Sequence, residues 1–122
     1  MLSQQENELE NLRAQLDKID EGLLDTLKAR VECCVQIALY KREHNIPMMQ
    51  PNRINFVQDR AACYALKNGL SESFLRSIYD LTITETCRIE DLVIENPQFT
   101  NQGQSIKSIM TEIQANKKKE HY

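Results

Sequence analysis

Two cations lie on what the sequence predicts to be one face of a long helix. Arg30 and Lys41 are eleven residues apart, so on a helix they lie within about 20° of each other around the axis and roughly 16 Å apart along it. Cys34 and Ile37 lie between them on the same face. Because arginine and lysine are seldom buried without a partner, this small apolar floor with a cation at each end is a candidate binding site for an anion. The alternative is that both side chains extend to water or pair with another helix.

Other polar residues could complete such a site. Arg53 opens the second predicted helix, where backbone N–H groups also favour anions. Thr86 and Glu90 are four residues apart on the third predicted helix, which places a hydroxyl beside a carboxyl. Arg13 lies about 25 Å before Arg30 and is rotated from it by roughly 100°, so both cannot reach one small molecule from the same helix. In an antiparallel dimer, the partner subunit's Arg13 could do so.

Helices would position these residues, because apolar residues recur at spacings of three and four and no strand-like alternation of useful length appears. We predict three helices, over about 5–43, 51–68 and 71–95. Pro51 suits a first helical position, and Gly69 suits a C-terminal cap. Ser71 is a suitable N-cap for the third helix.

The first predicted helix carries an unbroken apolar stripe. Its members are Leu9, Leu12, Leu16, Ile19, Leu23, Leu27, Val31, Cys34 and Ala38. The helix would be roughly 55–60 Å long, whereas a compact chain of this size has a radius of gyration of only about 14 Å. The other two helices are too short to cover the stripe, so we predict an intertwined homodimer. Periodicity alone is equally consistent with a plain coiled coil or three-helix bundle without chemistry.

The chain divides into a helical domain over 1–95 and a C-terminal extension over 96–122. Apolar residues at helical spacing predict a short fourth helix in the extension. They are Ile106, Ile109, Met110 and Ile113. We expect this helix to pack on the dimer and to end in a basic tail, and a role as a lid or as a docking site for a partner remains an alternative.

Composition excludes several classes of protein. The 122 residues have a net charge of −3, which gives no basic footprint for nucleic acid. The chain shows no signal peptide and no apolar run of membrane-spanning length, so we expect a soluble cytoplasmic protein. The four cysteines have no C-x-x-C spacing, and neither histidine lies near them in a zinc-finger pattern. We therefore expect no metal and no organic cofactor, and reduced, buried cysteines.

Four pieces of the sequence combine into a known pattern. They are LRAQLDKIDEGLLDTLKAR (12–30), IALYK ending at Lys41, Arg53 after a proline-bearing loop, and SIYDLTITETCRIED (77–91). Together they resemble the all-helical chorismate mutase family, over a run from Leu12 to Glu95. The resemblance implies an all-α intertwined dimer with two active sites. The partner subunit's Arg13 and the chain's own Arg30 would bind the substrate carboxylates through forked hydrogen bonds, and Arg53 would line the same cationic wall.

The same resemblance implies the roles of three further residues. Lys41 would lie against the ether oxygen of the enolpyruvyl group. Glu90 falls where most family members have a glutamine that also addresses this oxygen, and Thr86 matches a position that is often a small hydroxyl residue. A [3,3] rearrangement needs only a compact chair conformation of the substrate and stabilisation of the negative charge that grows on the ether oxygen. Glu90 must be protonated to donate there, so burial would have to raise its pKa.

Two positions depart from the usual family pattern. The residue after Arg53, commonly acidic and in contact with the C4 hydroxyl of the substrate, is Ile54, and a nearby position that is often aspartate is Gln50. The segments PMMQPNR (47–53) and ETCRIED (85–91) resemble the branch of the family that acts on 4-amino-4-deoxychorismate. Ordinary chorismate as substrate, elimination of pyruvate from isochorismate, and a non-catalytic helical dimerisation module are the alternatives.

Overall fold

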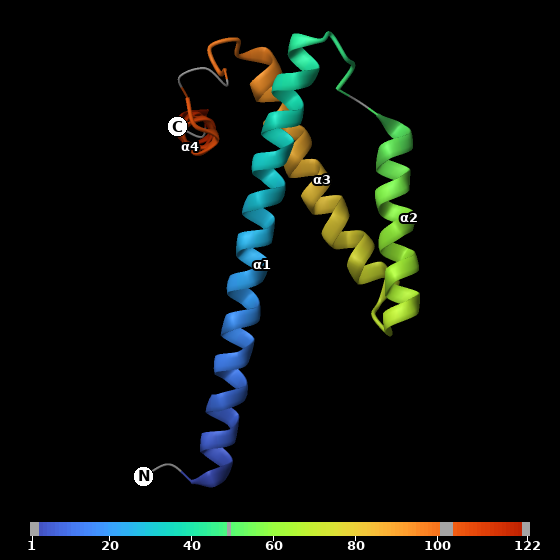
Figure 1. The fold of residues 1–122 in the computed structure, drawn as a ribbon, viewed down its shortest axis with the longest axis vertical. Helices are drawn as coiled ribbons and strands as arrows, with labels where there is room; N and C mark the ends of the chain where they lie inside the picture. The colour runs from blue at the N-terminus through green and yellow to red at the C-terminus, as the bar shows by residue number, and fades with distance from the viewer. Residues whose placement is uncertain (1–2, 49, 101–103, 121–122) are drawn as a thin grey trace. The chain divides into compact units, whose positions relative to one another are not determined.

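The computed structural model describes residues 3–48, 50–100 and 104–120, with side chains described up to Ala115 in the last segment. All regular structure in these segments is helical (Figure 1), which confirms the all-α prediction. The helices are α1 (Gln4–Glu43), α2 (Pro51–Asn68), α3 (Glu72–Glu95) and α4 (Ile106–Glu120). None of the described helices contains an apolar stretch of membrane-spanning length.

The chain forms two compact units, Met1–Val31 and Glu32–Tyr122. The first unit is one helical stretch, and it begins with a capping box. The Ser3 hydroxyl accepts a hydrogen bond from the Glu6 N–H at 3.1 Å, and the Glu6 carboxylate accepts one from the Ser3 N–H at 3.1 Å. The predicted apolar stripe is exposed along this unit, with Leu12 60% and Ile19 67% exposed. A lone helix has nothing against which to bury such a face.

Three local predictions for the second unit are confirmed. Pro51 is the first residue of α2, and Gly69 ends this helix at φ 70° and ψ 27°, in the left-handed region that glycine adopts without strain. The Ser71 hydroxyl accepts a hydrogen bond from the Phe74 N–H at 3.1 Å at the start of α3. Between these two caps the chain turns, so that α2 and α3 pack on each other as a helical hairpin (Figure 1).

The core of the second unit draws on all four helices. Its largest fully buried side chains are Phe99, Leu39, Ile109, Ile113, Val35 and Val93. The predicted fourth helix is present as α4, and its Ile109 and Ile113 are 0% and 1% exposed. Phe99 and helix α4, through Ile109 and Ile113, are therefore part of this core.

The cysteines differ from the expectation. All four are free, but Cys33 and Cys63 are exposed, and Cys34 and Cys87 are half-buried. The prediction that they are buried is wrong for this single chain. Cys33 and Cys34 point about 100° apart on α1, so only one of them can face the core.

A left-handed residue ends α1 and turns the chain into the loop before α2. Asn45 has φ 53°. The Ile46 N–H donates to the Lys41 carbonyl at 2.9 Å, and the Asn45 N–H donates to the Arg42 carbonyl at 3.5 Å. This is the bonding pattern of a Schellman cap. Asparagine enters the left-handed region more easily than other residues with a side chain, glycine excepted.

Replacing Asn45 by alanine is therefore expected to lower the free energy of unfolding by about 1 kcal/mol. Asn45→Gly is expected to keep or raise it, because glycine has no Cβ to strain this conformation. Urea denaturation of the three proteins measures the difference. Equal stability of the alanine and glycine variants would contradict the left-handed cap.

Candidate active site

Lys41 lies half-buried in the last turn of α1. Its Nζ donates a hydrogen bond to the carbonyl oxygen of Met48 at 3.0 Å, which fixes the ammonium group against the loop between α1 and α2. A lysine ammonium carries three N–H donors. It can therefore hold this carbonyl and still donate to a ligand.

The N-terminus of α2 carries three of the predicted site residues. Gln50 is the N-cap residue and is exposed, but its side-chain amide donates to the Pro47 carbonyl at 3.0 Å and makes no capping hydrogen bond. Arg53 is exposed, and its guanidinium carbon lies 5.1 Å from the centroid of the Phe56 ring, a cation–π distance. Ile54 is half-buried. This helix end therefore presents a cation and an apolar side chain, and the amide of Gln50 is engaged by the loop.

Thr86 and Glu90 are the two buried polar side chains among those that the structure describes, at 5% and 8% exposed. They lie one turn apart on the same face of α3. The Thr86 hydroxyl donates to the carbonyls of Thr82 and Ile83, at 3.0 and 3.2 Å, and its oxygen can still accept a hydrogen bond. Burial by itself favours the uncharged form of a carboxyl group. Thr86 and Glu90, both selected from the sequence, are thus buried, unlike the other polar side chains that the structure describes.

One side chain that the sequence analysis missed connects two parts of the predicted site. Arg42 Nη1 donates to the Val93 carbonyl at 2.9 Å, so this side chain links the last turn of α1 to the last turn of α3. Lys41 directly precedes Arg42, and Glu90 lies three residues before Val93. The structure therefore brings together the helix ends that carry Lys41 and Glu90.

The remaining two predicted residues belong to the first unit, Met1–Val31. Arg13 forms an ion pair with Glu10 at 2.8 Å, and both side chains are more than half exposed. A pair this exposed contributes little to stability, so Arg13 can exchange it for another anion at small cost. Arg30 is half-buried. A common site for these two arginines and the residues of the second unit stays a prediction.

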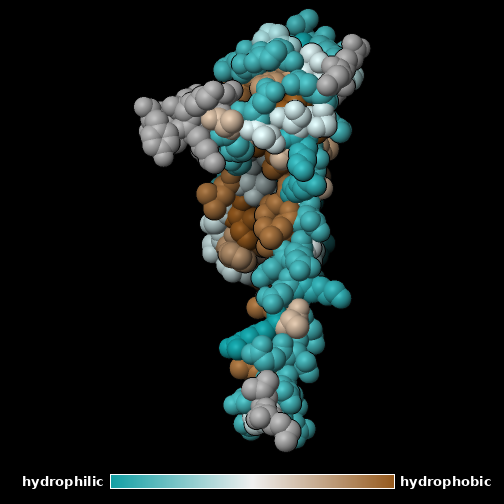
Figure 2. Space-filling view, turned by 90° about the vertical axis from the view of Figure 1, so that its left-hand side faces the viewer, coloured by the Kyte–Doolittle hydropathy of each residue, from teal (hydrophilic) through white to brown (hydrophobic). Residues whose placement is uncertain are grey.

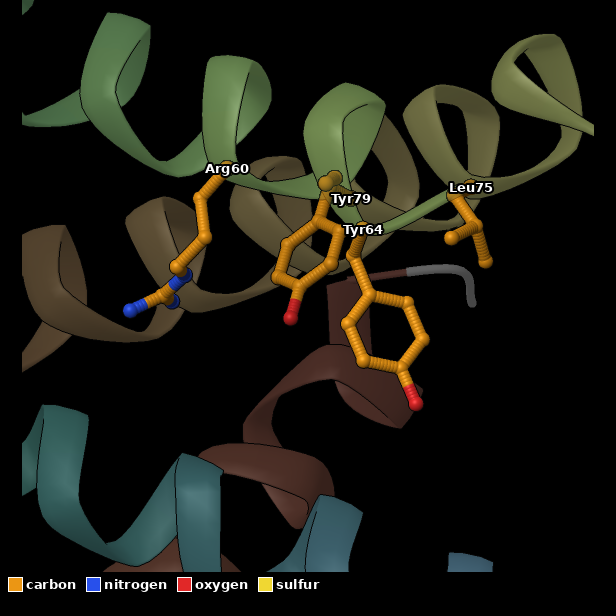
Figure 3. A pocket seen from close by; sticks show the side chains of 5 residues that line it. Arg60, Tyr64, Leu75 and Tyr79 are labelled. Carbon is orange, nitrogen blue, oxygen red and sulfur yellow. The ribbon is translucent and has the colours of Figure 1, made fainter. Parts of the chain in front are cut away.

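A hollow of about 270 Å³ lies elsewhere in the second unit, between α2 and α3 (Figure 3). It is lined by Arg60, Ala61, Tyr64, Leu75 and Tyr79. None of these is a predicted site residue, and the lining contains no carboxylate and no second cation to bind or activate a dicarboxylate. The hollow is better described as part of the apolar surface of the hairpin.

The family match covers every predicted site residue. The sequence pattern described as chorismate mutase type II matches residues 12–91. A protein from Streptomyces venezuelae named 4-amino-4-deoxychorismate mutase is 53% identical over 96 residues, which cover 79% of this chain and 93% of that relative. A protein of the same name from Streptomyces pristinaespiralis is 52% identical over 83 residues, or 68% of this chain and 64% of that relative. No solved structure matches the chain.

Proposed function

The chain belongs to the chorismate mutase type II family, and we propose that its substrate is 4-amino-4-deoxychorismate. As a member of this family it is an isomerase of the chorismate mutase type. The observation that carries the choice of substrate is the relative with that activity in its name, which is 53% identical over 93% of its own length. Ile54 and Gln50 offer no carboxylate to a C4 hydroxyl, but their chemistry does not explain a preference for a C4 ammonium group, which a carboxylate would also attract.

The proposed reaction is the [3,3] rearrangement to 4-amino-4-deoxyprephenate. The site holds the substrate as a chair and stabilises the charge that grows on the breaking ether oxygen. We assign this stabilisation to Lys41 and to a protonated Glu90. The joined ends of α1 and α3 and the burial of Glu90 support the assignment. Cationic side chains bind the two carboxylates, namely Arg30, Arg53 and the partner subunit's Arg13, and Thr86 and Ile54 line the same pocket.

A second copy of the chain would complete the site. Helix α1 has 40 residues, about 60 Å, and its N-terminal stripe is exposed. Helices α2 and α3 also expose large apolar side chains, and Figure 2 shows hydrophobic side chains gathered on one face of the molecule. The exposed ones on the hairpin are Phe56, Tyr64, Leu66, Leu70, Phe74, Ile78 and Leu81. Because apolar surface of this extent marks an interface, we infer an intertwined homodimer in which the stripe of one copy packs on the hairpin of the other.

Residues 1–95 form the mutase domain in this proposal, and residues 96–122 form an extension to it. The burial of Ile109 and Ile113 supports a structural contribution of the extension to the core. The basic end from Asn116 onward lies outside the described side chains.

The protonated state of Glu90 predicts a pH dependence. Below the pKa of Glu90 the acid can donate to the ether oxygen, whereas above it the carboxylate cannot donate and repels the growing negative charge. We therefore expect kcat to fall as the pH rises through this pKa. Glu90→Gln keeps an N–H donor at every pH, so its kcat is expected to be flat over about pH 5–9. Identical kcat profiles for the wild type and the glutamine variant would remove Glu90 from this role.

The choice of substrate is tested by supplying chorismate, 4-amino-4-deoxychorismate and isochorismate separately and identifying the products by mass spectrometry and NMR. We expect an isomer of unchanged mass from 4-amino-4-deoxychorismate, with kcat/KM at least about tenfold above that for chorismate. A preference for chorismate would overturn the substrate and leave the reaction type standing. Pyruvate released from isochorismate without a rearranged isomer would make the protein a lyase, and no turnover at all by a folded dimer would contradict the proposal.

A further inference from the structure

The guanidinium group of Arg42 is half-buried among backbone carbonyls. Its Nη1 donates to the carbonyl oxygens of Val93 at 2.9 Å and Asn96 at 3.1 Å, and its Nη2 donates to that of Phe99 at 2.5 Å. All three acceptors lie in the last turn of α3 or in the segment that follows it. The Arg42 side chain thus links the end of α3 and the start of the extension to the last turn of α1.

Arginine suits this position for two physical reasons. The last carbonyls of a helix have no partner within the helix and carry partial negative charge. Helix α3 has no basic residue in its own last turn, and it ends with Asp91 and Glu95, which add negative charge there. Arg42 supplies the missing cation. Its planar fork can also hold several acceptors at fixed positions, which a lysine ammonium on a flexible stem cannot do equally well.

The three hydrogen bonds of Arg42 lie next to Lys41 and Glu90, the two residues that the proposed function assigns to the ether oxygen. Lys41 is adjacent to Arg42 on α1, and Glu90 lies about one turn before Val93 on α3. The third acceptor belongs to Phe99, whose side chain is 1% exposed. Phe99 lies beyond the residues of the family match, 12–91. The extension is therefore fastened, through one guanidinium group, to the helix end that carries Lys41.

We propose that Arg42 is a positioning residue for the rearrangement. Together with residues 96–99 of the extension, it forms a brace that sets the separation of Lys41 and Glu90. This inference rests on the proposed function of Lys41 and Glu90. Misplacing a catalytic group by about 1 Å can cost a factor of about 10² in rate. A loosened brace should therefore slow the chemical step and leave binding of the substrate carboxylates, which is assigned to arginines outside the brace, nearly unchanged.

The test is Arg42→Lys in the full-length protein, assayed at a temperature at which circular dichroism shows every variant to be fully folded. We expect kcat to fall by a factor of about 10 to 100 while KM changes less than about threefold. Arg76→Lys is the matched control, because Arg76 is a half-buried arginine on α3 that pairs with Glu72 and Asp59, away from Lys41 and Glu90 in the sequence. It is expected to keep the wild-type kcat.

A double-mutant comparison separates positioning from a purely structural role. If Arg42 acts through Lys41, adding Arg42→Lys to Lys41→Ala should lower kcat further by less than about twofold. An unchanged kcat in folded Arg42→Lys would overturn the proposal, and so would a full additional loss on top of Lys41→Ala. Inactivity of the wild type toward all three substrates would instead overturn the proposed function on which the inference rests.

A second variant tests the brace from its other side should Arg42→Lys not fold. Phe99→Leu keeps Arg42 but removes part of the buried apolar side chain whose packing holds the Phe99 carbonyl in place. The same selective loss in kcat is expected, of about threefold or more with KM preserved. A folded Phe99→Leu protein with wild-type kcat would then overturn the proposal.

Discussion

Replacing Lys41 by alanine is expected to lower kcat/KM by a factor of about 10²–10³. The ammonium group is assigned to the ether oxygen, where negative charge grows only as the bond breaks, so its removal should affect kcat far more than KM. Its hydrogen bond to the Met48 carbonyl at 3.0 Å holds it in place before the substrate arrives. Preorganised donors of this kind contribute most when they need not reorient during the reaction.

The matched control for this variant is Lys67→Ala. Lys67 lies in the last turn of α2 and is exposed, so its loss changes the net charge equally and is expected to leave kcat/KM within about twofold of the wild type. Steady-state kinetics of the three proteins with 4-amino-4-deoxychorismate gives the comparison. A Lys41→Ala protein that is folded and retains more than about a tenth of wild-type kcat would show that the ether oxygen is stabilised by other groups.

Helix boundaries could be predicted where the residue that decides them acts locally. Pro51 fixes its own φ, Gly69 adopts left-handed angles without strain, and Ser71 satisfies a nearby N–H group. Each cause therefore lies within a few residues of its effect. Ser3 and Glu6 carry a signal of the same kind, which places the start of α1 at Gln4. The left-handed conformation of Asn45 after α1 was harder to predict, because asparagine adopts it only in some contexts.

The site could be predicted only where it depends on residue type. Thr86 and Glu90 were selected by their spacing on a predicted helix and by the family pattern, although their burial depends on packing. The role of Arg42 could not be predicted from the sequence, because its acceptors are backbone carbonyls 51 to 57 residues away and every residue type carries a carbonyl. The hydrogen bond from Lys41 to the Met48 carbonyl could not be predicted for the same reason.

The proposed intertwined dimer predicts that two inactive variants restore activity when their subunits are exchanged. Arg13→Ala and Lys41→Ala are each expected to be nearly inactive, because Arg13 is assigned to a substrate carboxylate in the partner's site and Lys41 to the site of its own chain. In a mixed dimer, the site with an intact Lys41 receives its Arg13 from the Lys41→Ala subunit and is complete. The other site carries both changes. Since random exchange makes about half of the dimers mixed, about one quarter of all sites should be active.

The measurement is kcat per site after co-refolding equal amounts of the two variants, compared with each variant refolded alone. The matched control is Lys41→Ala mixed with Glu90→Ala. Both residues belong to the second unit of one chain and are assigned to the same site, so every site in that mixture lacks one of them and activity should stay low. If Arg13 instead served the site of its own chain, the first mixture would behave like this control, because each site would then contain one damaged residue. Recovery to about a quarter of wild-type activity in the first mixture alone therefore requires that Arg13 crosses to the partner. The exposed apolar stripe around Arg13, with Leu12 60% and Leu16 56% exposed, is the surface that would carry it there.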